Sequence, residues 1–516
     1  MKHASPAKGA VSVEPPAGSL GSQYPLLKGA RFFAGNMTFE TVQKEFPRPV
    51  KLIGAYILNG EALKQYVNIG NDLEKRMRLY PFGEKPEAGN CCCFVMDRAF
   101  DTEGQTVVTF DIRTEYEVTR NPIGADFVPL AQLRWEYQAE NGWEELPVDF
   151  DTTYAFLQSG KIGFHLPGKM VQDSEYKAWQ IRVTLSENDY DVAPLIQNLS
   201  FNEIEVRQQY SYCDYEDYEA VPSGDGIYTV RSGMYLAKTG QAEIYVQAGD
   251  GFVQVSPEER EETREGDVVY SFSWQEPEEE GGLCVRLAVY EKEFRKGREI
   301  GTGKAYANQE YRLDIPDIVY DEFEIMVRDR QVGRFYPYRR VEDFDGCAPE
   351  DRVYVLDLEE NRLLFGNCEN GMAPDGEIHL LRLRVCGGQS GNIKAGRIRE
   401  CGGYKELLVR QYRQTYGGRD NETVEACYER VRQKFRNVSR GVTYADYEQL
   451  VRQTPGLLIK DCKVIPVTAA GKIPETAREN EIAIVVRPLS YQERDIRLNE
   501  KYRQNLEKTL QNGKIL

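Results

Sequence analysis

Between Asp351 and Ile398 the chain reads DRVYVLDLEENRLLFGNCENGMAPDGEIHLLRLRVCGGQSGNIKAGRI. Val353 to Leu358 form a short β-rich run, residues 359–361 supply a turn, and Arg362 to Phe365 return as a second strand. The segment is a predicted β-hairpin, and none of its residues forms a group suited to catalysis.

A run of sharp turns follows the hairpin. Gly366-Asn367, Asn370-Gly371 and Asp375-Gly376 are pairs that tolerate a positive φ, so the chain is predicted to fold back three times. A new strand should come next, with one face lined by alternate residues, namely His379, Leu381, Leu383 and Val385. We interpret the segment as a tightly bent β corner that sets the directions of neighbouring strands.

The order FGNCENGMAPDG, strand, CGGQSGNIKAG resembles the signature of the baseplate J-like family, the wedge components of phage tails and related contractile injection systems. That signature has FGDG, NG, a PP-G or AP-G element, and then a GG-GN element. This chain departs from it with Asn367 in place of aspartate and Cys368 where the pattern usually has glycine. Three more blocks, at residues 301–318, 339–357 and 439–456, resemble the family in the same order.

The resemblance implies a scaffold role for the residues of the corner and of the last block. These are Phe365, Gly366, Gly371, Pro374, Gly376, Gly387, Gly388, Gly391, Asn392, Arg440, Thr443, Asp446 and Tyr447.

The residues of the last block also predict a helix independently of the resemblance. Thr443 and Asp446 have the T-x-x-D spacing of a capping box, so a helix should start at Tyr444. Pro455-Gly456 cannot continue it, because proline disfavours the helical region for the preceding residue and glycine readily takes a left-handed cap. The predicted helix is about three turns long.

A second helix is predicted within NETVEACYERVRQKFRN, residues 421–437, with Asn421 as its cap. One stripe of this helix is apolar, at Val424, Cys427, Tyr428, Val431 and Phe435. Another face carries Arg430, Lys434 and Arg436. On an acidic protein a basic face is a candidate interaction surface, although a plain solvated face is the favoured interpretation.

Composition narrows the class of protein. The 516 residues carry a formal net charge of −17 with a pI near 5.0, which works against binding nucleic acid, whose phosphates need clustered cations. The 32 tyrosines and frequent turn residues favour β structure. No apolar run is long enough for a membrane helix, and synthesis and assembly in the cytoplasm are expected. The eleven cysteines are scattered without a secretion signal, as in a reducing compartment.

Alternating strands at 107–112, 133–137, 162–166, 179–185 and about 196–206 predict an N-terminal β-sandwich. Residues 134–167 resemble the sandwich that long baseplate J-like proteins carry upstream. The predicted fold class is α+β, β-rich and multidomain. The expected domains are a flexible arm (1–30), a region with the β-sandwich (31–210), a second β-rich segment (211–300), a β-rich baseplate J-like core (301–420) and a helical and α/β unit (421–516).

Two features of this division carry further expectations. In the last unit, strands at 459–466 and 482–486 and a helix at about 497–510 should form most of a two-layer α/β unit. The chain stops where members of the family continue into another strand, so three explanations stay open: the family's last part has been lost, the chain is truncated, or a partner chain supplies the missing strand. The acidic runs beginning at Pro257 and Glu276 are expected to be solvated loops, since neither has a calcium-loop pattern.

Catalytic and ligand-binding candidates are few. His3, His165 and His379 are far apart in sequence, and Cys91, Cys92 and Cys93 would alternate between the faces of a strand. Asp149 and Asp151 could serve as glycosidase acids, and Trp135, Tyr137 and Trp143 could stack on a sugar, but local or core roles are favoured for all five. CGGQSGN lacks the Lys-Ser/Thr of a phosphate loop.

The resemblance therefore implies a structural baseplate wedge component of a contractile injection system or phage-like tail. It would assemble with sibling wedge subunits around the hub and spike, anchor the sheath, and rearrange on contraction. No enzymatic activity, cofactor, nucleic acid or membrane insertion is expected. Two alternatives are a glycan-binding β-sandwich module of a surface adhesin and a carbohydrate-active enzyme acting through Asp149 and Asp151.

Overall fold

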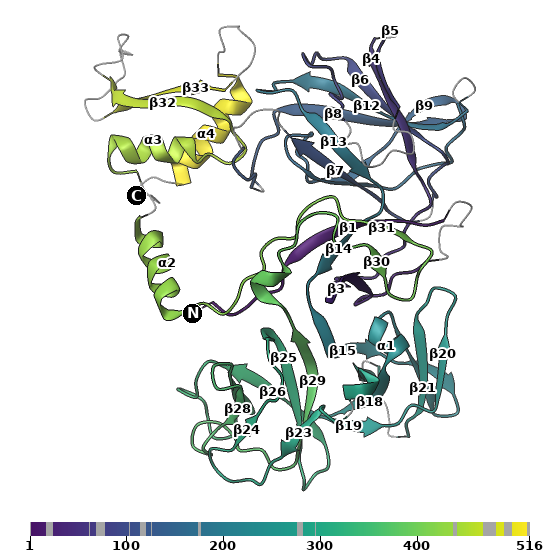
Figure 1. Cartoon of the computed structure of the whole chain (residues 1–516), viewed down its shortest axis with the longest axis vertical. Helices are drawn as coiled ribbons and strands as arrows, with labels where there is room; N and C mark the ends of the chain where they lie inside the picture. Colours follow the sequence, from purple (N-terminus) through teal and green to yellow (C-terminus); the bar gives the residue numbers. More distant parts are fainter. Residues whose placement is uncertain are drawn as a thin grey trace. The chain divides into compact units, whose positions relative to one another are not determined.

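A computed structural model shows a β-rich α+β protein, which confirms the predicted fold class (Figure 1). It divides into two compact units, Met1–Pro49 with Glu203–Cys427, and Val50–Asn202 with Tyr428–Leu516, so each unit is built from two separated stretches of chain rather than from one. The residues described are 2–16, 24–60, 62–68, 78–102, 104–113, 120–124, 126–173, 177–275, 282–294, 296–436, 441–467, 481–489 and 498–512.

The expected flexible arm is wrong for residues 2–16. Strand β1 (Lys8–Glu14) pairs antiparallel with β14 (Glu203–Arg207) on one side and β31 (Leu408–Arg410) on the other. Val11 and Val13 are fully buried, because the alternation in GAVSVE places both on the core face. The first twenty residues are rich in Pro and Gly, which favoured the prediction of an arm over that of a strand. Residues 17–23 lie outside the described part.

The first unit contains a six-stranded sheet that includes β1. Its core is apolar and centres on Phe32, Phe39 and Val206. The strand order is β30 (Glu400–Cys401), β2 (Arg31–Ala34), β3 (Met37–Thr41), β14, β1 and β31.

An eleven-stranded sheet forms the largest part of the same unit. The strand order is β19 (Gly251–Val255), β18 (Gln241–Ala248), β22 (Cys284–Tyr290), β15 (Tyr210–Glu219), β29 (Glu377–Val385), β25 (Ile318–Arg328), β26 (Phe335–Val341), β27 (Val353–Asp357), β28 (Arg362–Phe365) and β24 (Glu310–Arg312), and β23 (Glu299–Thr302) also pairs with β29. The predicted hairpin is confirmed, since β27 and β28 pair antiparallel with Tyr354 opposite Phe365.

Strand β29 is buried on both faces, whereas the sequence pattern indicated one. Ile378 and Leu380 are as buried as Leu381 and Leu383, and Val385 keeps partial exposure. The reason is its central place in the sheet, between β15 and β25, with further layers of side chains above and below.

The segment 211–300 closes a second core. A four-stranded sheet and helix α1 (Tyr235–Thr239) pack against β18 and β22. The strand order of this sheet is β16 (Val221–Gly224), β17 (Ile227–Ser232), β21 (Val268–Ser273) and β20 (Glu259–Glu262). Strands β18, β21 and β22 account for much of the β-rich character expected of this segment. The prediction that the acidic run beginning at Pro257 is a solvated loop is partly wrong, because four of its residues form β20, an exposed edge strand. Residues 276–281 lie outside the described part.

The second unit contains the predicted β-sandwich. A six-stranded sheet faces a four-stranded sheet. The strand order of the first is β5 (Ala62–Asn68), β4 (Leu52–Asn59), β6 (Asn90–Met96), β12 (Trp179–Asn188), β8 (Ala131–Ala139) and β9 (Gly142–Glu145). The strand order of the second is β10 (Val148–Asp151), β11 (Gly160–Phe164), β7 (Thr106–Arg113) and β13 (Leu195–Ser200). The single strand expected near 196–206 is wrong: it is two strands, β13 here and β14 in the first unit, separated by Phe201-Asn202.

The C-terminal elements form the predicted two-layer module (Figure 1). Helices α3 (Tyr444–Arg452) and α4 (Glu500–Asn512) and strands β32 (Ile459–Pro466) and β33 (Ile482–Pro488) share a core with Phe127 and Leu130 of the sandwich region. Helix α4 begins three residues later than expected, because the Asn499 side chain accepts the Tyr502 amide and so caps the helix. None of the helices in the described ranges combines the length and apolarity that crossing a membrane requires.

His379 is expected to make the stability of the first unit depend on pH. Burial, with smaller contributions from Arg298 and Arg328, lowers the pKa of His379 to about 3. The unfolded chain would bind a proton near pH 6.5, so stability present above that pH is lost as the pH falls. Between pH 6.5 and 5 this residue alone should cost about 2 kcal/mol of unfolding free energy. Urea titrations should show a shallower acid dependence in His379→Phe, and equal slopes in the two proteins would contradict the assignment.

Candidate functional site

The first half of the corner is a backbone crossing with almost no room for side chains. The Asn367 side chain accepts the amides of Glu369 and Asn370, which closes a tight turn. Cys368 has a φ of 69°, the left-handed conformation that favours glycine. The departure at Cys368 therefore preserves the turn at some cost in strain.

Gly376 is the most constrained position of this half. Its φ is 139°, and a Cβ atom there would overlap the carbonyl oxygen of Arg328. Its amide and carbonyl both bond to Gly303, with N···O distances of 3.2 and 2.6 Å. Two of the sequence blocks noted above, 301–318 and the corner, therefore meet here through their backbones.

Side chains complete this junction. The carbonyl of Pro374 accepts hydrogen bonds from the amide of Ala305 (2.9 Å) and the buried side chain of Gln309 (3.0 Å). The Phe365 ring lies edge-on to Tyr311 and Tyr338. Gly366 and Gly371 approach so closely that a Cβ on Gly366 would overlap the Gly371 carbonyl.

The second half of the corner lies at the other end of β29. The Gly387 amide donates to the Gln208 side chain (2.6 Å), and the Gly391 carbonyl accepts from the Thr415 hydroxyl (2.6 Å). Gly388 has a φ of 53°, and a Cβ there would overlap the carboxylate of Asp420. Only a short 3-10 turn (Gly388–Gly391) follows, with no helix after it, in line with a strand end rather than a phosphate loop.

The Asn392 side chain ties this half to a loop before α2. It donates to the Gly418 carbonyl (2.7 Å) and accepts from the Gly418 amide (2.9 Å). The two halves of the corner are separated by the nine residues of β29, a span of about 30 Å. The signature glycines therefore do not converge on one site.

The capping box at Thr443 is confirmed. The Thr443 hydroxyl accepts the Asp446 amide, and the Asp446 carboxylate accepts the Thr443 amide at 2.8 Å. Backbone donation from Thr443 lowers the pKa of Asp446. The Tyr447 ring packs on Gly441, and the helix ends before Gly456, whose φ is 71°. These residues belong to the second unit, and Arg440 lies outside the described residues.

Helix α2 (Val424–Arg436) forms as predicted, but its cap and its apolar face differ from expectation. Thr423, not Asn421, accepts the amide of Ala426, while Asn421 accepts the amide of Ala4. Among the described residues the apolar stripe is largely exposed, with exposed fractions of 66% at Val424, 71% at Tyr428, 39% at Val431 and 85% at Phe435.

The expected basic face of α2 is less distinct than this stripe. Lys434 is exposed, and Arg430 is half-buried and has an interaction partner. The neighbouring Arg432 pairs with Glu429 at 3.7 Å. The side chain of Arg436 lies outside the described part.

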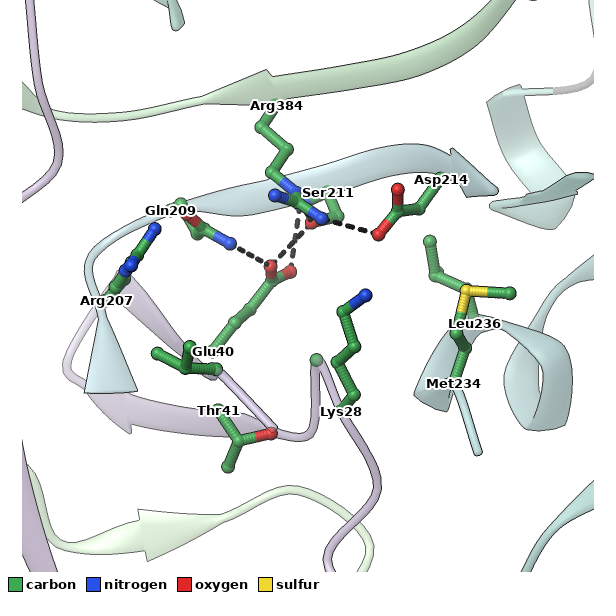
Figure 2. Close-up of a pocket in the computed structure, with 12 residues that line it drawn as sticks. Lys28, Glu40, Thr41, Arg207, Gln209, Ser211, Asp214, Met234, Leu236 and Arg384 are labelled. Atoms are coloured by element: carbon green, nitrogen blue, oxygen red, sulfur yellow. Dashed lines mark hydrogen bonds and ion pairs between the residues drawn. The ribbon is translucent and has the colours of Figure 1, made fainter. Parts of the chain in front are cut away.

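A buried network of charges next to β29 was not predicted (Figure 2). The Arg384 guanidinium donates to Asp214 (2.5 Å), Glu322 (2.7 Å) and the Ser211 hydroxyl (3.2 Å). Two positions earlier, Arg382 donates to Asp214 (2.8 Å) and Glu324 (2.5 Å). The only sequence signal was the alternation of arginines in RLR and of acids in DEFE, which surface strands share.

Glu40 is the most buried carboxylate in this network, with an exposed fraction of 1%. It accepts hydrogen bonds from the Ser211 amide (2.8 Å), the Ser211 hydroxyl (2.6 Å) and Gln209 (3.2 Å), as Figure 2 shows. Burial raises the pKa of Glu40 despite these donors. Burial also acts to raise the pKa of Asp214, but Arg384 and Arg382 outweigh it, so that pKa lies below its usual range.

The cavity beside Glu40 has a volume of about 50 Å³, and Lys28, Arg207 and Met234 complete its lining. This volume is small for an organic ligand, since ligand sites are usually about 300 Å³ or more. The network therefore acts as an internal cross-link between β3, β15, β25 and β29.

The catalytic and sugar-binding candidates have local structural roles. Asp151 accepts the amides of Thr153 and Ala155, and Asp149 pairs with Gln105 and His165. Trp135 and Tyr137 are buried in the sandwich core, and the Trp143 ring lies under the Arg182 guanidinium. The sandwich thus forms no open aromatic platform from these three rings.

The cysteine triplet alternates as expected. Cys92 faces the sandwich core, whereas Cys91 and Cys93 lie on the other face with Tyr56. A hydrogen bond from the Cys93 thiol lowers the pKa of Cys91 to about 7, and burial raises the pKa of Cys92. Within the described residues, no three or more His, Cys, Asp or Glu side chains are grouped so as to hold a metal ion.

Comparison with known proteins adds little. No family model and no curated protein matches the sequence. Among solved structures, the type VI secretion system TssK-TssF-TssG baseplate subcomplex, revealed by cryo-electron microscopy, is similar over 90% of this chain and 78% of the matched chain, with 8% sequence identity and a TM-score of 0.36. A score of that size does not establish a shared fold, so it supports no conclusion about this chain.

Alanine substitutions at two glycines should distinguish two destabilising effects: overlap of the new Cβ atom with a neighbouring atom, and the strain of a positive φ in a residue other than glycine. Gly376→Ala must displace the Arg328 carbonyl and should cost about 3 kcal/mol or more of unfolding free energy. Gly346→Ala is the matched control, because Gly346 also has a positive φ (75°) but has no atom within 4 Å of the added Cβ. It should cost about 1 kcal/mol. Similar losses in both variants, measured by denaturant unfolding, would show that the crossing at Gly376 is not tight.

Removing the cation at Arg384 should leave the buried carboxylate of Asp214 with one partner fewer. Arg384→Met leaves Asp214 and Glu322 without this partner and should lower the unfolding free energy by about 3–5 kcal/mol. Arg397→Met, at an exposed arginine, is the control and should change it by less than about 0.5 kcal/mol. Adding Asp214→Asn to Arg384→Met should recover part of the loss. A double variant no more stable than the single one would argue against the pairing.

Proposed function

We propose that this chain is a structural component of a baseplate, acting as a wedge subunit of a contractile injection system or phage-like tail. In this role it assembles with sibling wedge subunits around the hub and spike, anchors the sheath, and rearranges on contraction. The chain contributes shape and binding surface, and no chemical transformation is assigned to it. The proposal includes assembly in the cytoplasm and incorporation into the particle's baseplate.

The observation that carries this proposal is the uncovered apolar face of α2. Tyr428 and Phe435 are large rings that expose 71% and 85% of their surface on one helix. A helix of thirteen residues is marginal in water on its own, and most helix stability in proteins comes from packing an apolar face. An exposed face of this kind is typical of a protein-binding surface. A subunit of a larger assembly has a use for such a helix.

The resemblance of four sequence blocks to the baseplate J-like family gives this binding surface a context. The structure brings two of these blocks, 301–318 and the corner, into direct backbone contact at Gly303 and Gly376. The corner holds strands by steric fit, and the charge network beside it is internally paired, as suits a rigid frame rather than a reactive site.

The general test is co-expression with the neighbouring genes, followed by electron microscopy for sheathed particles. Particles should require this chain. Gly388→Val, which places a branched residue at a φ of 53° against Asp420, should block their assembly. Normal particle numbers without the chain, or turnover of a substrate by the purified protein, would overturn the proposal.

Helix α2 provides a sharper test that spares the fold. The double variant Tyr428→Ser and Phe435→Ser removes two exposed rings and should leave the unfolding free energy within about 0.5 kcal/mol of the parent. Binding to sibling subunits should weaken by about 3 kcal/mol, roughly a hundredfold. Tyr416→Ser is the matched control, because Tyr416 is 64% exposed outside α2, and it should bind normally. Equal pull-down of all three proteins would exclude α2 as the contact.

A further inference from the structure

The C-terminal module contains a sheet of only two described strands, β32 and β33. A two-stranded sheet leaves a row of unpaired backbone groups at each outer edge, and such edges are templates for pairing with another strand. The two edges of this sheet are treated differently.

The outer edge of β32 is blocked. The amide of Val464 donates to the Glu448 side chain of α3 at 3.0 Å. Pro466, two residues later on the same edge, has no amide hydrogen to offer. These are devices that natural proteins use to protect an edge strand.

Among the described residues, the outer edge of β33 carries such protection only at its end, where the even-numbered Pro488 has no amide hydrogen. The Leu489 amide donates to Leu458, and the Glu481 carbonyl accepts from Val467, so the odd-numbered residues of β33 point their backbone groups toward β32. The even-numbered residues Ile482, Ile484 and Val486 therefore direct theirs away from it. No strand among the described residues pairs with that edge.

The side chains of β33 agree with an unfinished sheet. Ile484 and Val486 face the module core but keep partial exposure, and Val485 on the opposite face is 55% exposed. No charged residue interrupts residues 482–486, although inward charges and prolines are the usual protection of an edge. The stretch of the free edge formed by residues 482–486 is therefore uncharged and apolar.

Charges occur only at the two ends of this stretch, and they are of opposite sign. Glu481 precedes it and Arg487 follows it, and both side chains are exposed. Antiparallel pairing of two identical copies about Ile484 places residue 482 opposite 486, 483 opposite 485, and Glu481 opposite Arg487, on both sides of a two-fold axis. Parallel pairing would place like charges side by side.

We propose that β33 pairs antiparallel with β33 of a second copy of this chain, with Ile484 on the two-fold axis. The two modules then share a four-stranded sheet in the order β32, β33, β33, β32. Each of the three facing pairs of even-numbered residues exchanges two hydrogen bonds, and two Glu481–Arg487 ion pairs set the direction. Arg487 also lies 3.8 Å from Asp461 on β32, so each ion pair extends an existing contact. The inference uses the C-terminal module alone and does not depend on a role in a baseplate.

A charge exchange in the full chain tests this pairing. Sedimentation equilibrium between about 1 and 100 µM should show a monomer–dimer equilibrium. Arg487→Glu or Glu481→Arg alone converts two attractive pairs into two repulsive ones and should raise the dimer dissociation constant about tenfold. The double variant Glu481→Arg with Arg487→Glu restores both pairs and should return the constant to within about threefold of the parent. Lys463→Glu, an equal charge change at an exposed site on β32, is the matched control.

Amide hydrogen exchange provides a second measurement. Protection at Ile482, Ile484 and Val486 should rise with protein concentration, and the odd-numbered amides, which already bond to β32, should stay protected throughout. A chain that remains monomeric at every concentration would overturn the proposal. So would a dimer that is indifferent to the single charge reversals, or even-numbered amides that are protected equally in the monomer, because the edge would then be covered from within the chain or by another surface.

Discussion

The first unit depends on the placement of β29 between β15 and β25. A strand that is buried on both faces and paired along both edges leaves little room for added side chains in the turns that lead into and out of it. Gly376 at its start and Gly388 just after its end satisfy that constraint. At both positions a Cβ atom would overlap a neighbouring oxygen, the carbonyl of Arg328 in one case and the carboxylate of Asp420 in the other. The signature glycines are therefore a consequence of how β29 is buried.

The charge network fixes the register of the same strand. Arg382 lies opposite Glu324 of β25, and Arg384 lies opposite Ser211 of β15. Slipping β29 by one residue would separate both guanidinium groups from the buried carboxylate of Asp214, at a cost of several kcal/mol. Apolar residues alone would tolerate such a slip more easily in a strand that is apolar on both faces. Buried ion pairs add little net stability, so their role here is best understood as selection of one register.

The elements governed by local rules were predictable from sequence, and those set by long-range pairing were not. The hairpin ending at Phe365, the capping box at Thr443 and the sandwich strands follow from turn residues, spacing and alternation. Strand β1 was hidden because its partners, near 205 and 409, are far away in sequence. The network around Glu40 draws one carboxylate from residue 40 and its donors from residues 209 and 211, and no local pattern marks those positions as neighbours. Irregular register, at bulges between Glu324 and Ile325 and between Ser211 and Cys213, further breaks the simple alternation.

Two elements remain incompletely satisfied within the described chain, and they differ in what they lack. Helix α2 pairs the backbone groups of its interior along the helix but leaves Tyr428 and Phe435 in water, so a partner would contribute apolar surface. Strand β33 lacks hydrogen-bond partners instead. Its apolar core face is half-covered, but three of its residues have backbone groups that no described strand pairs. Apolar packing tolerates many orientations, whereas hydrogen-bonded strand addition permits very few. A partner bound at α2 would therefore be held with adjustable geometry, and a partner bound at β33 with fixed geometry.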